Sequence, residues 1–205
     1  RKADKFSQER TESVLLRPKR LIVGSVHSED ELVILDSIVS LKREIADLTL
    51  VWVPHEPSER IVTTAESFFQ SKQFATARLG YKNPDQIDAE VIIVDTIGRL
   101  SQLYWFGQFA YIGGGFSTGV HNVMEPAIAR LPVFFGPRYK NFHEAEELIA
   151  DGGGFSIETG TDLYLGIKHL FEDRNAFIKA SYAATEVIHR NLGSSTRVVR
   201  NLIHD

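Results

Sequence analysis

Short apolar runs recur along the chain, and segments with helical spacing of apolar residues lie between them. We expect strands at residues 21–24, 48–53, 91–94, 109–113, 132–136 and 154–157. Helices are expected at residues 30–44, 58–71, 98–106, 122–130, 142–150, 161–171 and 174–190. This alternation, with short connections, predicts an α/β fold: a Rossmann-like three-layer domain in which helices cover both faces of a parallel sheet.

In a sheet of this kind, ligands bind at the carboxyl ends of the strands. Polar or glycine-containing loops follow five of the expected strands, and we expect them to meet at one crevice. The loops are residues 24–25, 54–55, 95–98, 113–115 and 136–138.

The glycine run at residues 113–115 stands out among these loops. Glycines allow positive φ angles and close approach of a ligand, and a helix that begins near residue 121 would offer unpaired N–H groups to an anion. We expect a phosphate at Gly114 and Gly115. Asn122 and Glu125 are three residues apart, so they share one helical face, where the Glu125 carboxylate can accept hydrogen bonds from a ribose. For these two residues alone a capping box is the alternative; the glycine run favours the binding site.

Other candidate binding residues come from the remaining loops and their flanks. Thr96 could line the crevice or act as a helix N-cap. Arg138 could donate to a ligand at the rim or simply face solvent. The full set of expected binding residues is Gly24, Ser25, His55, Thr96, Ile97, Gly98, Gly114, Gly115, Ser117, His121, Asn122, Glu125, Arg138 and Asn141.

Residues 115–119 also match G-x-S-x-G, the nucleophile elbow of α/β-hydrolases. A triad would need an acid and a histidine downstream, and Asp162 with His169 or His189 are the candidates. Both histidines, however, lie on helix-patterned segments with charged neighbours. An elbow also passes from its serine directly into a helix, whereas four further residues, Thr-Gly-Val-His, follow Ser117. The binding-loop interpretation is therefore favoured, and we expect no catalytic residue in this chain.

Other glycine and metal motifs are missing from the sequence. There is no G-x-G-x-x-G and no Walker lysine, which argues against NAD and ATP. There is no Asp-x-Asp pair, and the His/carboxylate pair considered as a cluster is His121 with Glu125, four residues apart. We expect no metal and no cofactor. The acidic run at residues 29–31 is expected to be a solvated first helical turn.

Composition places the chain among soluble globular proteins, with 43% apolar and 24% charged residues and no apolar run near the roughly 20 residues of a membrane helix. A net charge of −4 without a long basic run argues against a nucleic-acid surface. The absence of cysteine fits a reducing compartment, with the cytoplasm as the default.

The chain starts at Arg1 without a methionine or signal peptide, and its first 19 residues are polar and patternless. We expect residues 1–19 to be a leader or inter-domain segment and residues 20–205 to be one folded domain. We also expect a further domain in a longer protein.

Several blocks together resemble the 3-deoxy-D-manno-octulosonic acid (Kdo) transferases, which are GT-B glycosyltransferases. The match runs from about residue 21 to near the end of the chain, and the order and spacing of the blocks make it specific. The blocks are residues 24–31 (GSVHSEDE), 53–57 (VPHEP), 95–100 (DTIGRL) followed by Tyr104, 113–115 (GGG), 121–125 (HNVME), 136–137 (GP), 141–142 (NF) and the closing 191–194 (NLGS).

The resemblance implies the C-terminal, donor-binding half of a GT-B fold, which would hold CMP-Kdo without a metal. The absent N-terminal half would bind the lipid A precursor, supply the carboxylate general base and contact the cytoplasmic face of the inner membrane of a Gram-negative bacterium. This chain alone would then be inactive. UDP-sugar transferases, UDP-sugar 2-epimerases and a nucleotide-binding module without chemistry are the alternatives. Two positions depart from the family pattern: His55 and Arg99 stand where the family has Arg and Glu. Arg99 or Arg138 could replace the missing positive charge.

Overall fold

The computed structural model describes residues 13–203, with side chains described as far as residue 191. Its centre is a seven-stranded sheet in which every neighbouring pair is parallel. The strand order is β3-β4-β2-β1-β5-β6-β7. The strands are β1 (Arg20–Val26), β2 (Thr49–Pro54), β3 (Thr76–Arg78), β4 (Val91–Ile93), β5 (Phe109–Ile112), β6 (Val133–Phe135) and β7 (Gly154–Ser156).

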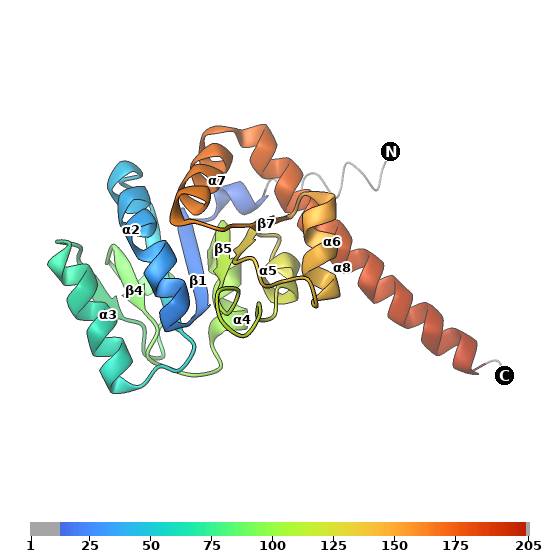
Figure 1. Cartoon of the computed structure of the whole chain (residues 1–205), viewed down its shortest axis with the longest axis horizontal. Helices are drawn as coiled ribbons and strands as arrows, with labels where there is room; N and C mark the ends of the chain where they lie inside the picture. Colours follow the sequence, from blue (N-terminus) through green and yellow to red (C-terminus); the bar gives the residue numbers. More distant parts are fainter. Residues whose placement is uncertain (1–12, 204–205) are drawn as a thin grey trace.

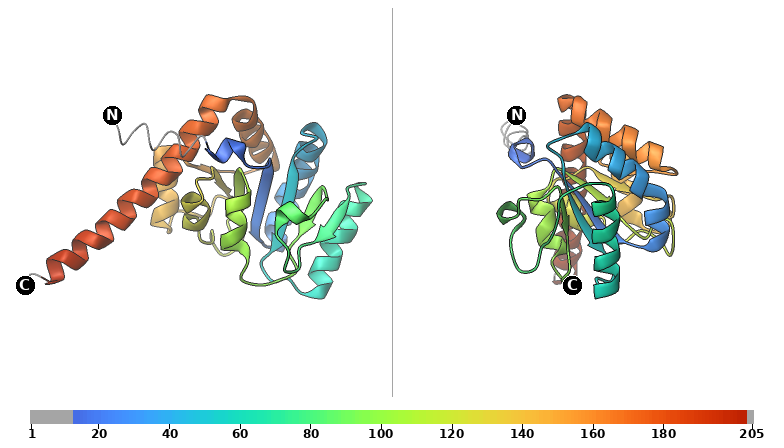
Figure 2. Two further views of the ribbon diagram at one scale, coloured as in Figure 1. Left: turned by 180° about the vertical axis from the view of Figure 1, so that it is seen from behind. Right: turned by 90° about the vertical axis from the view of Figure 1, so that its left-hand side faces the viewer.

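Helices cover both faces of this sheet, which confirms the predicted three-layer α/β architecture (Figures 1 and 2). Helices α2 and α7 pack together on one face, while α5 and α6 both pack against α8. The α-helices are α2 (Ser28–Glu44), α3 (Glu59–Ser71), α4 (Leu100–Leu103), α5 (Met124–Ile128), α6 (His143–Asp151), α7 (Gly160–Glu172) and α8 (Arg174–Ile203). Short 3-10 helices are η1 (Ser13–Leu16), η2 (Pro84–Gln86) and η3 (Tyr104–Phe106).

The hydrophobic core runs through the centre of the sheet. Ile22 of β1 is in register with Val51 of β2 and Ala110 of β5, and Val51 is in register with Ile92 of β4. All four side chains are fully buried. Strands that are buried on both faces are apolar along their length, which is why the apolar runs located β1, β2, β4, β5 and β6 correctly. The partly exposed edge strand β7 was also located correctly.

Four expectations about the elements need correction. The three-residue edge strand β3 was not predicted. The helix expected at residues 122–130 is only the five-residue α5, and the one at 98–106 divides into α4 and η3. Helix α8 continues to Ile203 and projects beyond the sheet (Figure 1), so residues 191–194 are helical and the expected helix end at residue 190 is wrong.

The segment before β1 packs on the domain from Ser13 onward. Val14 is fully buried, Gln108 Nε2 donates to the carbonyl oxygen of Arg17 at 2.9 Å, and Arg17 donates to the carbonyl oxygen of Ala129 at 2.9 Å. Residues 1–12 of the expected leader lie outside the described residues. The boundary at residue 20 stays a prediction.

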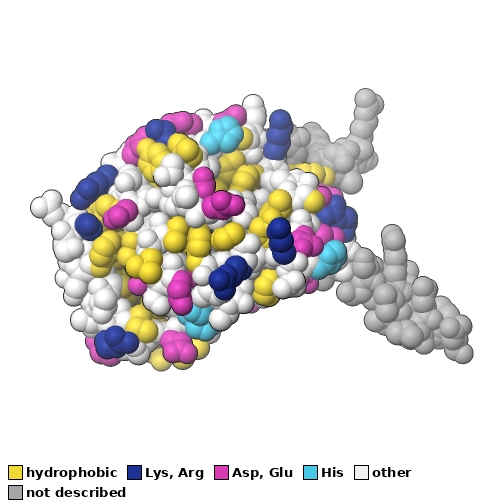
Figure 3. Space-filling view, viewed as in Figure 1, with side chains coloured by type: hydrophobic (Ala, Val, Ile, Leu, Met, Phe, Trp, Pro, Cys, Tyr) yellow, Lys and Arg dark blue, Asp and Glu magenta, His cyan; other side chains and the backbone are white. Residues whose placement is uncertain are grey.

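No helix in the described part of the chain is long and apolar enough to cross a membrane. On the face seen in Figure 3, basic and acidic side chains are interspersed. That face therefore offers no concentrated basic patch of the kind that binds nucleic acid.

Candidate functional site

The strand order reverses direction between β1 and β5. After β1 the chain continues to β2 on one side, whereas after β5 it continues to β6 on the other. Loops at such a switch point leave a crevice that binds ligands in open α/β sheets. Gly24 and Ser25 end β1 on one side of the switch point, and the glycine loop at residues 113–115 follows β5 on the other.

The glycines of this loop are required by the protein's own packing. A Cβ atom at Gly113 would lie 2.1 Å from the carbonyl oxygen of Ser25, and one at Gly115 would lie 2.5 Å from the Gly136 nitrogen. Gly114 has a φ of +89°, a conformation that glycine adopts at little cost. Our expectation that these glycines make room for a ligand was therefore incomplete, because backbone already fills the space beside them.

Asp30 connects the end of β1 to the glycine loop at residues 113–115 through hydrogen bonds. Its side chain is fully buried and accepts hydrogen bonds from the Gly114 nitrogen at 2.8 Å, the Tyr111 hydroxyl at 2.8 Å and the His27 nitrogen at 3.0 Å. The expectation that Asp30 belongs to a solvated acidic turn is wrong. The Gly114 amide is also engaged by Asp30, which corrects the expectation that this amide is available to a phosphate.

Three histidines meet at the carboxyl ends of the central strands. His27 follows β1, His55 follows β2, and His121 follows the glycine loop. Their ring centroids lie 4.2–4.9 Å apart, and the interplanar angles are 7–24°. His27 Nε2 and His121 Nε2 are 2.6 Å apart. We call these three residues the histidine cluster.

The electrostatics of the cluster favour a neutral imidazole at His121. Burial lowers the pKa of His121, and His55 and His27 lower it further, while Asp30 acts in the opposite direction. A charged imidazole at residue 121 would lose water and face two neighbours that can themselves become cations. His121 therefore offers a nitrogen lone pair near neutral pH.

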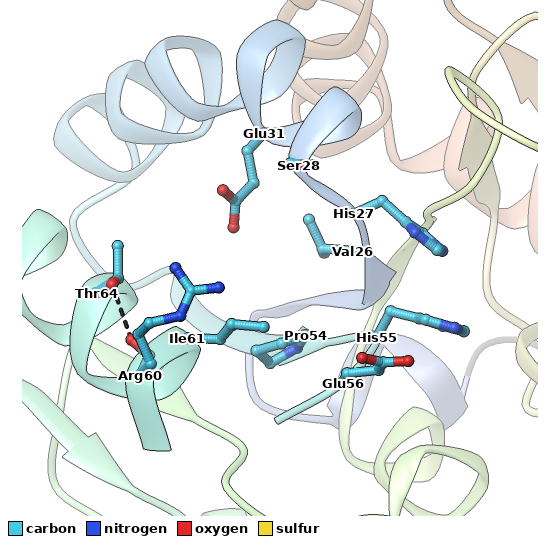
Figure 4. Close-up of a pocket in the computed structure, with 10 residues that line it drawn as sticks. All are labelled: Val26, His27, Ser28, Glu31, Pro54, His55, Glu56, Arg60, Ile61 and Thr64. Atoms are coloured by element: carbon cyan, nitrogen blue, oxygen red, sulfur yellow. Dashed lines mark hydrogen bonds between the residues drawn. The ribbon is translucent and has the colours of Figure 1, made fainter. Parts of the chain in front are cut away.

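A cleft of about 500 Å³ opens beside the cluster, between the first turns of α2 and α3 (Figure 4). Glu31 and Arg60 point into it from the two helices, and the His27 and His55 rings lie side by side at its edge. Of the ten residues that line this cleft, only His55 was expected from the sequence to be a site residue. Arg60 is a better candidate than Arg99 for the positive charge discussed above, because Arg99 donates to the carbonyl oxygens of Gly80 and Lys82 at 3.1 Å each.

The Glu31 carboxyl gives a pH-dependent test of this cleft. Its pKa is raised by burial and by Asp30, so its ionisation destabilises the folded chain above that raised pKa, and the cost disappears below the ordinary glutamate pKa of 4.5. We expect Glu31→Gln to be more stable than the parent at pH 8, by less than about 1 kcal/mol since the half-exposed carboxyl is screened by water. Urea unfolding at pH 8 and pH 4 measures this. An equal effect at both pH values would contradict it.

Asn122 and Glu125 contact each other, but they do not form the capping box considered for them. The Asn122 amide donates to Glu125 Oε1 at 3.1 Å, and its oxygen accepts from the Met124 nitrogen at 3.0 Å, while the N-cap of α5 is Val123, without a side-chain cap hydrogen bond. Glu125 is half-buried and, after burial itself, is the second cause of the raised pKa of Tyr104. Tyr104 in turn lies against Gly24 at the end of β1. Glu125 therefore lies close enough to Tyr104 to affect its ionisation, and its carboxylate is oriented by Asn122.

The loop after β4 adds an unsatisfied hydroxyl. Among the described residues, the Thr96 Oγ1 atom is one of three buried side-chain polar atoms without a hydrogen-bond partner. Ile97 is 87% exposed, and Gly98 has a φ of +79°. The loop thus presents an exposed apolar side chain next to a buried hydroxyl that has no hydrogen-bond partner.

Arg138 and Asn141 line a separate cleft of about 300 Å³, and His121 and Asn122 line a third of about 370 Å³. Phe142 borders both of these clefts. Arg138 donates to the carbonyl oxygen of Ser117. Five of the expected site residues therefore line these three clefts, and the other nine line none of the three.

The hydrolase alternative does not fit the geometry. Ser117 lies in a turn, its φ is not positive, and no helix begins until Met124. His169 and His189 are exposed on α7 and α8. A nucleophile elbow needs a strained serine directly before a helix, and Ser117 has neither feature.

Comparison with known proteins places these features in context. No family model matches the sequence. The chain is 27% identical over 190 residues to the 3-deoxy-D-manno-octulosonic acid transferase of Aquifex aeolicus, covering 87% of this chain and 51% of that protein. It is 31% identical over 172 residues to the enzyme of the same name from Rickettsia typhi, covering 83% and 37%.

The chain is a relative of the Kdo transferases. It spans about half or less of the length of these relatives. The C-terminal CMP-Kdo binding domain of WaaA from Acinetobacter baumannii has the same fold, with a TM-score of 0.68, 21% identity, and coverage of 90% of this chain and 98% of that one. The UDP-GlcNAc 2-epimerase of Neisseria meningitidis bound to UDP-GlcNAc is also similar, with a TM-score of 0.62, 14% identity, and coverage of 98% and 48%.

These findings confirm the resemblance to Kdo transferases and the Rossmann-like fold expected of a GT-B C-terminal domain. They do not test individual site residues. The structure adds Asp30, His27, Glu31 and Arg60 to the residues proposed from the sequence. His27, Asp30 and Glu31 lie in the block at residues 24–31 that resembles the family, so that block was the signal that could have pointed to these three.

Proposed function

We propose that this chain is the donor-binding part of a glycosyltransferase that transfers Kdo from CMP-Kdo to a lipid A precursor in lipopolysaccharide biosynthesis. The main support is the sequence similarity to Kdo transferases across most of the chain, together with the fold of a CMP-Kdo binding domain. The switch point between β1 and β5, with clefts along its edge, gives the nucleotide a place to bind.

Within this proposal, Glu125 accepts hydrogen bonds from the ribose hydroxyls, and Thr96 offers its unpaired hydroxyl nearby. The anionic groups of the donor meet positively charged side chains at the edge of the sheet, for which Arg60 and Arg138 are the candidates. Holding the departing CMP in this way stabilises the negative charge that develops on its phosphate as the sugar leaves.

The rest of the reaction is assigned to a part of the protein outside this chain. An N-terminal half would bind the lipid acceptor, supply the general base and contact the cytoplasmic face of the inner membrane. The chain of residues 1–205 is then expected to bind the nucleotide without catalysing transfer. An assay of the full-length protein with CMP-Kdo and a lipid A precursor would test this assignment directly.

Calorimetric titration with CMP, UMP and UDP tests the nucleotide proposal. We expect CMP to bind most tightly. Glu125→Ala should weaken CMP binding by about 10- to 150-fold, since a hydrogen bond to a charged group contributes about 1.5–3 kcal/mol. Glu146→Ala removes the same charge from an exposed position on α6 and serves as the control.

Other results would redirect the assignment. Preference for UDP would favour a UDP-sugar transferase or 2-epimerase. If CMP binds but Glu125→Ala leaves the affinity unchanged, the ribose lies elsewhere. If no nucleotide binds to the folded chain, the donor-binding proposal for this chain is wrong. A full-length protein that binds CMP but lacks transferase activity would favour a nucleotide-binding module without chemistry.

A further inference from the structure

The histidine cluster has the composition of a metal-binding site. One ligand-type nitrogen from each of His27, His55 and His121 lies within 4.8 Å of the others, and no other group of three such residues converges in the part of the chain searched. In a tetrahedral zinc site each nitrogen is about 2.0–2.1 Å from the ion, which places two nitrogens about 3.3 Å apart. The nitrogen–nitrogen distances in the cluster lie on both sides of this value, from 2.6 Å for the closest pair up to a limit of 4.8 Å.

The backbone holds all three histidines in place. The His27 nitrogen donates to Asp30 at 3.0 Å, the His55 nitrogen donates to the Val26 carbonyl at 2.9 Å, and the His121 nitrogen donates to the Gly113 carbonyl at 3.2 Å. Two of these acceptors belong to the switch-point strands or their loops, and the third is the fully buried Asp30. These bonds fix the backbone from which each ring extends, so binding an ion requires adjustment of the rings and not of the strands.

The movement needed to bring three nitrogens around one ion can be made mainly by the exposed side chain of His55. His27 and His121 are half-buried, whereas His55 is exposed at the edge of the cleft and can rotate toward the other two. Moving His55 inward while the closest pair separates slightly would bring three nitrogens around one centre. The cleft would leave the fourth position open to water or to an anion.

We propose that His27, His55 and His121 bind one divalent transition-metal ion of the zinc class, with an open coordination position toward the cleft. Imidazole nitrogen is a preferred ligand of Zn²⁺, Co²⁺, Ni²⁺ and Cu²⁺, whereas Mg²⁺ and Ca²⁺ prefer oxygen. This proposal stands on the side-chain geometry alone and does not depend on the nucleotide proposal. It replaces the expectation, drawn from the sequence, that the chain has no metal site.

Cobalt titration provides the test. Metal-free chain, without a polyhistidine tag, is titrated with Co²⁺ and followed by visible absorption, and Zn²⁺ is then added in competition. We expect one Co²⁺ per chain, a spectrum typical of four- or five-coordinate cobalt, and complete displacement by Zn²⁺. Mg²⁺ in large excess should displace neither ion.

Two variants assign the site. His55→Ala should weaken Zn²⁺ binding by more than about 10-fold, because losing a ligand costs at least as much as losing one of its supporting contacts. His169→Ala, which removes an exposed histidine on α7, should leave the affinity unchanged. Thermal unfolding without metal establishes that both variants fold. Absence of Co²⁺ binding to the folded parent chain, or equal affinity in His55→Ala, would overturn the proposal; the cluster would then be a hydrogen-bonded group of imidazoles.

Discussion

Replacing Asp30 with Ala is expected to lower the free energy of unfolding by about 3–5 kcal/mol, one of the two largest effects near the site. The carboxylate is fully buried and accepts from the Tyr111 hydroxyl and from the nitrogens of Gly114 and His27. Removing it leaves three donors without their acceptor and opens a space beside the glycine loop. Two of these donors, the Tyr111 hydroxyl and the Gly114 nitrogen, are buried. Urea unfolding followed by circular dichroism measures the change.

The neighbouring residue gives a matched control. Glu29 lies in the same helical turn and carries the same charge, but it is exposed. Glu29→Ala should therefore change stability by no more than about 0.5 kcal/mol. Asp30→Asn retains the shape of the side chain and should have an intermediate effect, since it keeps one acceptor oxygen. Equal losses for Asp30→Ala and Glu29→Ala would show that Asp30 does not connect the two loops in solution.

Much of the fold could be predicted because the central strands are buried on both faces. Apolar runs such as those that became β1 and β5 are continuous, and a continuous run marks a buried parallel strand. The edge strand β3 escaped because its three residues are Thr76, Ala77 and Arg78, all half-buried. Because β3 pairs with a neighbouring strand on one edge only and contains no apolar run, its sequence does not distinguish it from a loop.

The site was predicted less completely because contacts between distant residues decide it. The glycine run identified the correct loop, but its spacing could not reveal that Asp30 would engage the Gly114 amide. An acidic residue in a first helical turn is usually solvated, and only the sheet order places this one beneath the loop after β5.

The histidines show the same limit. His27, His55 and His121 belong to three separate blocks, and none lies at a spacing that local motifs use for metal ligands. They meet because β1 lies between β2 and β5, which brings the carboxyl ends of these three strands to one edge. A search for sequence motifs therefore missed a cluster that follows from strand order.

Gly113→Ala is expected to destabilise the domain by about 3 kcal/mol and to weaken binding at the switch point. The new Cβ would lie 2.1 Å from the Ser25 carbonyl oxygen and 2.8 Å from Asp30 Oδ2. Because the nearest atoms belong to backbone, the end of β1 and the glycine loop must separate, and overpacking of this kind costs about 1–3 kcal/mol or more. Urea unfolding gives the stability change, and CMP titration of the remaining folded protein gives the change in affinity.

Gly98→Ala separates this steric effect from backbone strain. Gly98 has a φ of +79° with nothing within 4 Å of an added Cβ, whereas Gly113 does not have a positive φ. Gly98→Ala should therefore cost only the roughly 1–2 kcal/mol of a left-handed alanine. If Gly113→Ala is no more destabilising than Gly98→Ala, the two loops are not in the close contact described here. A larger loss in Gly113→Ala, accompanied by weaker CMP binding, would link the packing of the glycine loop to the function proposed for this edge of the sheet.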